Sequence, residues 1–249
     1  MSPYTSPSAA PRGLTFGMAA ESYERFRPGY PDEVVERTLA FAGRDVKRAV
    51  EVGSGTGKAT RAFASRNIHV TALEPDPDMF SVLRRETAGM PVVPVHTTFE
   101  AYAGPPTDLV FAAASWHWTD PGMRWGHTAD LLVAGGVVAV FGSPLRIADP
   151  VVEAAATAAG APTPVEATDP APDRAGLAES GVFHDVEEHL LEREVVVSQR
   201  DYVGHLSTLS TFLDLRPDAR HEALRRVASV LPAQVHLDLG VRLLLARRA

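Results

Sequence analysis

The chain has 249 residues, 45% of them hydrophobic, so it can bury the core of one large domain or two small ones. Its formal net charge of −7 argues against nucleic-acid binding, which depends on cationic contacts with phosphate. The absence of cysteine excludes disulfides and thiolate metal sites, and no apolar stretch approaches the ~20 residues of a membrane-spanning helix. Residues 1–13 are rich in Ser and Pro and lack the apolar core of a signal peptide. We therefore expect a cytoplasmic protein with a disordered tail over residues 1–15 and no membrane or nucleic-acid partner.

Helices and strands are predicted to alternate up to residue 142. Two helices, over 21–27 and 33–42, come first and are separated by Pro28, Gly29 and Pro31. Strands are expected over 46–52, 68–73, 92–96, 109–113 and 137–141, with helices over 58–66, 76–87 and 124–133. Because strands that alternate with helices form right-handed crossovers, we predict an α/β fold with a parallel sheet covered by helices on both faces.

The pattern loosens after residue 142. A segment rich in Ala, Pro and Asp follows over 148–178, with one helix near 151–159 and no motif. Residues 186–198 alternate like a strand, residues 200–231 are helical in at least two pieces, and 234–247 form a last strand. We expect the two late strands to pair antiparallel at the edge of the sheet, with the intervening helices capping a pocket.

A glycine-rich segment follows the first expected strand. It reads Ala49-Val50-Glu51-Val52-Gly53-Ser54-Gly55-Thr56-Gly57. Glycines let the backbone turn tightly and approach a ligand with no Cβ in the way. A second acidic residue, Glu74, ends the next strand, and an acidic side chain there can accept both hydroxyls of a ribose. This layout predicts a ligand that carries a nucleoside.

Three kinds of nucleotide-binding loop compete for this segment. The dinucleotide fingerprint Gly-x-Gly-x-x-Gly fits poorly, because Lys58 occupies the place of its third glycine. A phosphate-binding P-loop fails twice, because Val52 stands where it needs a glycine and Ala59 where it needs Ser or Thr. The pattern that remains is Glu-x-Gly-x-Gly-x-Gly. The alternative without function is a plain glycine-rich turn.

On these residues the chain resembles the class I S-adenosylmethionine-dependent methyltransferases of the methyltransferase type 11/25 kind, over about residues 16–142 and more loosely beyond. Three further pieces carry the resemblance. The first, Tyr23-Glu24-Arg25-Phe26-Arg27-Pro28-Gly29-Tyr30-Pro31, is similar to the lid segment of such enzymes. The second, Leu73-Glu74-Pro75-Asp76-Pro77-Asp78-Met79, stands where the family places its ribose carboxylate. The third, Thr97-Thr98-Phe99-Glu100, replaces the adenine-edge loop, which usually has a small and an acidic residue where this chain has Thr98 and Phe99.

The resemblance implies a Rossmann-like, doubly wound sheet of seven strands, mostly parallel with an antiparallel edge pair. It also implies one methyltransferase domain. We expect lid helices over 16–45, a cofactor-binding core over 46–142, cap insertions with strand six over 143–233 and the last strand over 234–249.

The implied cofactor is S-adenosyl-L-methionine, with S-adenosyl-L-homocysteine as the product. Glu74 would hold the ribose, and Glu51 would hold the methionine ammonium or the loop backbone. Arg27 would pair with the methionine carboxylate or remain a solvated cation, and Met79 would contact adenine or belong to the core. The full set of expected cofactor residues is Tyr23, Arg27, Glu51, Gly53, Ser54, Gly55, Gly57, Glu74, Pro75, Met79, Thr98, Phe99 and Ala114.

His117 is the candidate catalytic base, because it follows the fourth strand at the edge where open α/β sheets bind ligands. The alternative is a structural histidine wedged between Trp116 and Trp118. These two tryptophans would wall the substrate pocket or pack in the core, and His205 is a weaker second candidate for that pocket. No His, Asp or Glu cluster has the spacing of metal ligands, so we expect no metal.

The resemblance implies a methyltransferase that modifies an O, N or C atom of a small molecule, and secondary metabolism is its expected setting. One alternative is a protein on the same scaffold that binds the cofactor without transferring methyl, either as a rearrangement catalyst or as a non-catalytic binding module. A nicotinamide oxidoreductase is a more distant alternative. The sequence does not predict the oligomeric state.

Overall fold

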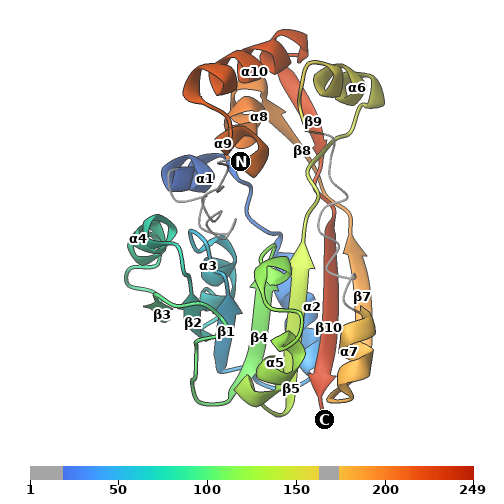
Figure 1. Ribbon diagram of the computed structural model, residues 1–249. Coiled ribbons are helices and arrows are strands. Elements are labelled where there is room, and N and C mark those ends of the chain that lie inside the picture. The colour runs from blue at the N-terminus through green and yellow to red at the C-terminus, as the bar shows by residue number, and fades with distance from the viewer. Residues whose placement is uncertain (1–18, 163–173) are drawn as a thin grey trace, which may run out of the picture.

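The computed structural model describes residues 19–162 and 174–249 and has a central seven-stranded sheet (Figure 1). The strand order is β3-β2-β1-β4-β5-β10-β7, and neighbouring strands from β3 to β5 run parallel. Strand β10 pairs antiparallel with both β5 and β7, so the predicted fold class and the antiparallel edge pair are confirmed. The strands are β1 (Arg48–Val52), β2 (His69–Leu73), β3 (Val92–Val95), β4 (Thr107–Ala113), β5 (Leu132–Gly142), β7 (Phe183–Leu191) and β10 (Val241–Arg248).

Helices cover both faces of this sheet because successive residues of its buried strands point to opposite sides. On one face, Val34, Phe63 and Leu83 bring α2, α3 and α4 against the strands. On the other face, Trp125 and Leu177 bring α5 and α7 against them. The helices are α1 (Ala20–Phe26), α2 (Asp32–Ala42), α3 (Lys58–Ala64), α4 (Pro77–Glu86), α5 (Arg124–Leu131) and α7 (Arg174–Ser180).

A second, smaller sheet carries the remaining helices, and we call this part the cap. Its strands lie in the order β6-β9-β8 and have their own hydrophobic core. In Figure 1 the cap lies at the end of the molecule opposite the C-terminus, beyond the carboxyl ends of the central parallel strands. Its elements are β6 (Arg146–Ile147), α6 (Pro150–Ala158), β8 (Glu194–Ser198), α8 (Gln199–Leu206), α9 (Ser210–Leu213), α10 (Pro217–Val230) and β9 (Gln234–Asp238).

The single strands predicted over 186–198 and 234–247 were wrong, because each is split between the two sheets. Strands β7 and β10 pair in the central sheet, whereas β8 and β9 pair in the cap. The break between β7 and β8 lies beside the break between β9 and β10, because the Leu239 N–H donates to the Arg193 carbonyl at 2.7 Å. Within the second break, the Asp238 carboxylate accepts the Gly240 N–H at 2.9 Å. A two-stranded ribbon therefore turns at this point and links the central sheet to the cap.

Two expectations concern residues that the structure does not describe or describes only in part. The tail predicted over 1–15 lies outside the described residues, as does 163–173 within the segment 148–178. In the described part of that segment, α6 confirms the helix expected near 151–159, and the start of α7 was not predicted.

Candidate functional site

A cavity of about 710 Å³ lies between the carboxyl ends of β1, β2 and β4 and the cap. The expected site residues line it, with the exceptions of Gly57 and Trp116. The lining residues are spread along the sequence from Tyr23 to Leu239, so the sheet topology brings them together. A volume of this size is typical of cavities that enclose small molecules, which are about 300–1,000 Å³.

The glycine loop follows β1 and is held in a conformation that favours glycine at three positions. The φ angles are 64° at Gly53, 56° at Gly55 and 89° at Gly57. A Cβ on Gly53 would lie 2.7 Å from the Ser115 Cβ, and one on Gly57 would lie 2.8 Å from the Leu83 Cδ1. A Cβ on Gly55 would meet no atom within 4 Å. Gly53 and Gly57 thus allow close packing of the protein, whereas Gly55 faces open space at the cavity.

Glu74 follows β2 and joins the glycine loop to the turn that precedes α4. Its carboxylate accepts the Gly55 N–H at 2.7 Å and the Asp76 N–H at 2.8 Å, one on each oxygen. The side chain is only 5% exposed, and this burial raises the pKa of Glu74 to about 7 against the opposing effect of the two backbone bonds. Because an ionised carboxylate has about four lone-pair sites, each oxygen can still accept a hydroxyl from a ligand.

Glu51 is the second acidic residue at the loop, on β1. It is 1% exposed and accepts a hydrogen bond from the Thr60 hydroxyl of α3. Burial raises the pKa of Glu51 to about 8, and the Thr60 bond opposes that effect. The carboxyl group therefore gains a proton at neutral pH more readily than an ordinary glutamate, and a cationic ligand group beside it would favour the ionised form.

A further group of cavity residues comes from α4 and the segment after β3. Met79 is buried in a small cluster with Ala20 and Val82 and also lines the cavity. Phe99 is buried and packs edge-to-face against His127, with ring centroids 4.7 Å apart. The Thr98 hydroxyl accepts the Ala101 N–H at 3.3 Å, which leaves its own proton free to donate.

The segment after β4 carries the aromatic candidates. Ala114 has a φ of 55°, which is unusual for a residue with a side chain, and the Ser115 hydroxyl donates to the Val52 carbonyl at the end of β1. Trp116 is buried in the core, where its ring centroid lies 4.8 Å from that of Trp125, so it does not line the cavity. Trp118 is 45% exposed and does line it.

His117 lies on the 3-10 helix of residues Trp116–Trp118 and faces the cavity. Its ring centroid is 4.4 Å from that of Trp118. Because Trp116 points into the core, the histidine is not wedged between two tryptophans. Desolvation by the surrounding protein lowers the pKa of His117, and the nearby Arg124 guanidinium lowers it further. The imidazole is therefore neutral at pH 7 and able to accept a proton.

Arg27 joins the segment after α1 to the cap, and His205 lies in the cap beside the cavity. The Arg27 guanidinium donates from Nε to the Thr208 hydroxyl at 2.9 Å and lies 4.9 Å from the centre of the Tyr23 ring. His205 on α8 is 4% exposed and lines the cavity. Burial, with a contribution from Arg27, lowers the pKa of His205 to about 3, so this imidazole is neutral as well.

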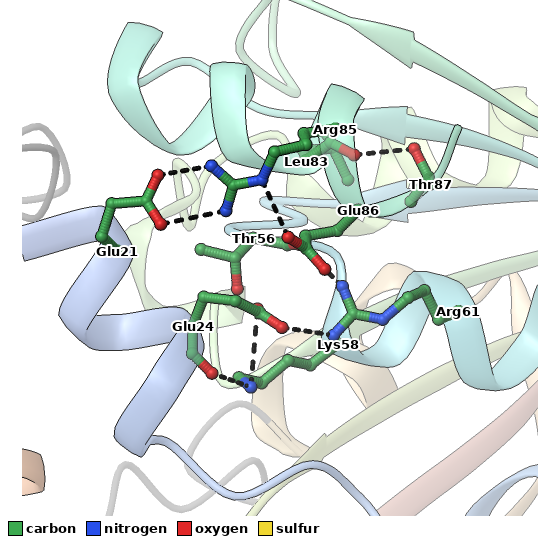
Figure 2. Close-up of polar contacts among 9 residues, drawn as sticks. All are labelled: Glu21, Glu24, Thr56, Lys58, Arg61, Leu83, Arg85, Glu86 and Thr87. Carbon is green, nitrogen blue, oxygen red and sulfur yellow. Dashed lines mark hydrogen bonds and ion pairs between the residues drawn. The ribbon is translucent and has the colours of Figure 1, made fainter.

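Lys58 has a role that the sequence did not reveal. Figure 2 shows two acidic residues of α1 held by cations of α3 and α4. The Lys58 Nζ donates to the Glu24 carbonyl at 2.6 Å and lies 3.5 Å from its carboxylate, and Arg61 pairs with that carboxylate at 2.7 Å (Figure 2). Arg85 makes two contacts with Glu21, at 2.5 and 3.0 Å. The lysine that departs from the dinucleotide fingerprint thus fastens α1 beside the cavity.

Residues 19–162 and 174–249 contain neither a candidate metal centre nor a candidate membrane-spanning helix. No group of three or more His, Asp or Glu side chains is placed to hold a metal ion. Nor does any described helix have the length and apolar character to cross a membrane.

Comparisons with known proteins bear on the region around this cavity. Residues 49–136 match the model of a methyltransferase domain. Uncharacterized methyltransferases of Mycobacterium tuberculosis and Mycobacterium bovis are 38% identical to the chain over 126 residues, which is 49% of this chain and 49% of theirs. The chain therefore spans about half the length of the curated relatives it matches.

Solved structures resemble most of the chain in fold at low sequence identity. A candidate type II methyltransferase from Anaeromyxobacter dehalogenans superposes with a TM-score of 0.66 and 21% identity, over 89% of this chain and 98% of that one. Phosphoethanolamine N-methyltransferase 2 of Haemonchus contortus, in complex with S-adenosyl-L-methionine, gives 0.55 and 16%, over 93% and 57%. The matched segment contains the glycine loop and Glu74, and these comparisons confirm the predicted resemblance to class I methyltransferases.

Proposed function

We propose that the chain is an S-adenosylmethionine-dependent methyltransferase that methylates a small molecule. One observation carries the proposal. Gly55 faces open space at the cavity, and its N–H is bound by Glu74, a buried carboxylate that retains lone pairs for a ligand. A glycine turn and a ribose-binding carboxylate thus line the same cavity.

The residues present fit the cofactor. A side chain at position 55 would occupy the space that a ligand needs, and the chain has a glycine there. Glu74 would accept the ribose hydroxyls, and Glu51 would bind the methionine ammonium. Met79 and Phe99 would flank the adenine with apolar surface, and Thr98 would offer its hydroxyl to the adenine edge. When bound, S-adenosyl-L-methionine supplies an electrophilic methyl group on a sulfonium. The Haemonchus contortus protein, which binds this cofactor on the same fold, supports the assignment.

The protein's contribution to the reaction is to orient the acceptor and exclude water. Holding two reactants in line can supply most of the acceleration of a displacement of this kind. His117, which is neutral at pH 7, would take the acceptor's proton at its free ring nitrogen if the acceptor is a hydroxyl or an acidic carbon. The proposed acceptor is an O, N or C atom of a small molecule, and the proposed setting is secondary metabolism.

The parts of the chain that line the cavity have different proposed roles. We assign the lid to the segment around α1, the cofactor site to the central sheet and the acceptor site to the cap. Arg27 is bonded to Thr208 of the cap, so its proposed role is to close the cavity rather than to pair with the methionine carboxylate.

Formation of S-adenosyl-L-homocysteine tests the function. The protein would be incubated with S-adenosyl-L-methionine and pools of small amines, phenols and carboxylic acids, and the product would be measured by mass spectrometry. Product above the rate of a Gly55→Val variant is expected with at least one pool. Tight cofactor binding without turnover on any pool would favour a protein that uses the cofactor without transferring its methyl group.

A further inference from the structure

The side of the cavity that faces the cap is largely apolar. We call it the cap branch and define it by Leu145, Ile147, Ala156, Leu206, Leu209 and Leu239. These residues come from β6, α6, α8 and the segments after β5, α8 and β9, which lie apart from the glycine loop. An apolar surface of this kind gains free energy by covering apolar parts of a ligand.

Two polar atoms in the cap branch are buried without a partner. The Glu153 Oε1 on α6 and the His205 Nδ1 on α8 have no hydrogen-bond partner in the described part of the chain. Both residues line the cavity, and His205 is more than nine-tenths buried. Because a buried polar atom without a partner is unfavourable, these atoms point to a ligand with polar groups, and the Glu153 oxygen requires a hydrogen-bond donor.

Within the cap branch, the charge around Glu153 favours a cation. Glu153 takes part in none of the ion pairs found within residues 19–162 and 174–249. Tyr202 also lines the cavity, and burial together with the Glu153 carboxylate raises the pKa of Tyr202 to about 12, so this phenol stays neutral. A carboxylate beside a neutral aromatic ring attracts an ammonium group and disfavours an anion.

We propose that the cap branch holds the methyl acceptor and selects a molecule with an apolar body and a basic amine, with the amine bound by Glu153 beside Tyr202. This proposal rests on the proposed function, which gives the cavity its methyl donor. Helix α6, which carries Glu153, packs against α10 and β6 within the cap. The amine is therefore the end of the acceptor that is held in the cap, and a different atom faces the glycine loop.

Calorimetric titration with simple probes tests this assignment. The protein would first be titrated with S-adenosyl-L-homocysteine, and then, both free and saturated with it, with n-octylamine, 1-octanol and octanoate at about pH 7. The three probes share one chain length and differ in charge. Octylamine is expected to bind at least about tenfold more tightly than octanol, and octanoate is expected to bind most weakly.

Matched variants test whether the preference for octylamine depends on Glu153. Glu153→Gln keeps the shape of the side chain and should weaken octylamine binding by about tenfold or more, with octanol binding unchanged. Tyr202→Phe keeps the aromatic ring and should weaken it less. Glu192→Gln, an exposed glutamate between β7 and β8, serves as the control and should change nothing. Circular dichroism would verify that each variant is folded.

Three outcomes are distinct. Preference for octylamine that depends on Glu153 supports the proposal. Equal binding of octylamine and octanol, or octylamine binding that Glu153→Gln leaves unchanged, overturns it, even where S-adenosyl-L-homocysteine binds normally. Failure of S-adenosyl-L-homocysteine to bind, with amine binding still dependent on Glu153, overturns the proposed function and leaves the amine site in place.

Discussion

Replacement of Glu74 by alanine should weaken cofactor binding more than any other change to a single carboxylate at the glycine loop. A hydrogen bond to a charged group contributes about 1.5–3 kcal/mol, and each 1.4 kcal/mol is about tenfold in affinity. Loss of one bond to a ribose hydroxyl therefore predicts a decrease of about 10- to 150-fold, and loss of two predicts more. We expect a decrease of at least about tenfold.

The structure adds a second consequence of this change. Glu74 also accepts the N–H groups of Gly55 and Asp76. Without the carboxylate these donors lose their partner, which costs about 1–3 kcal/mol each unless water replaces it. Glu74→Ala should therefore lower the free energy of unfolding as well, and a folded fraction must be established before affinities are compared.

Titration calorimetry with S-adenosyl-L-homocysteine at about pH 8 measures the effect under conditions in which Glu74, with a pKa of about 7, is mostly ionised. Asp78→Ala is the control, because this exposed carboxylate lies in the first turn of α4 and does not line the cavity. It should bind like the unmodified protein. Equal affinity of folded Glu74→Ala and the unmodified protein would refute the assignment of Glu74 to the ribose.

Three further predictions concern the same cavity. Gly55→Ala should abolish detectable cofactor binding, because the added Cβ enters the open space of the site. Gly89→Ala is the control, because it places alanine at a similar positive φ away from the cavity, and it should bind the cofactor normally. Normal binding by Gly55→Ala would contradict the assignment of this cavity to the cofactor. His117→Ala should lower turnover far more than cofactor affinity if the imidazole is a base, whereas equal losses in both would indicate a structural role. The raised pKa values of Glu51 and Glu74, about 8 and 7, mean that the folded protein binds more protons than the unfolded chain between about pH 4.5 and 8. The free energy of unfolding should therefore fall as the pH rises from about 4.5 to about 8, and the fall should be complete above the two folded-state pKa values. Thermal unfolding should show a smaller fall for Glu51→Gln, and an unchanged pH dependence in that variant would contradict the assignment.

The core of the fold was accessible from the sequence because its signals are local. Apolar runs such as 109–113 are typical of buried parallel strands, and turn residues separate them from helices. The glycine loop and Glu74 occupy fixed positions relative to β1 and β2, so their meeting in one cavity followed from the strand order. The structure places the glycine loop and Glu74 together at the cavity, and their roles in cofactor binding are proposals.

The cap could not be predicted in the same way. Strands β7 and β8 form one alternating run in the sequence, and only the contact between Leu239 and Arg193 shows where the ribbon leaves the central sheet. Glu153 and Tyr202 were missed because they are almost fifty residues apart and share no motif. Gly57 and Trp116 stand next to cavity residues in the sequence, yet packing against Leu83 and Trp125 turns them away from it.

Calorimetric titration of the purified chain with S-adenosyl-L-methionine, S-adenosyl-L-homocysteine and NAD tests the central claim most directly. Micromolar binding of the two methionine-derived compounds and no binding of NAD is the result that a class I methyltransferase site predicts. A folded protein that binds neither methionine-derived compound would contradict the assignment of the Gly55 and Glu74 cavity to this cofactor.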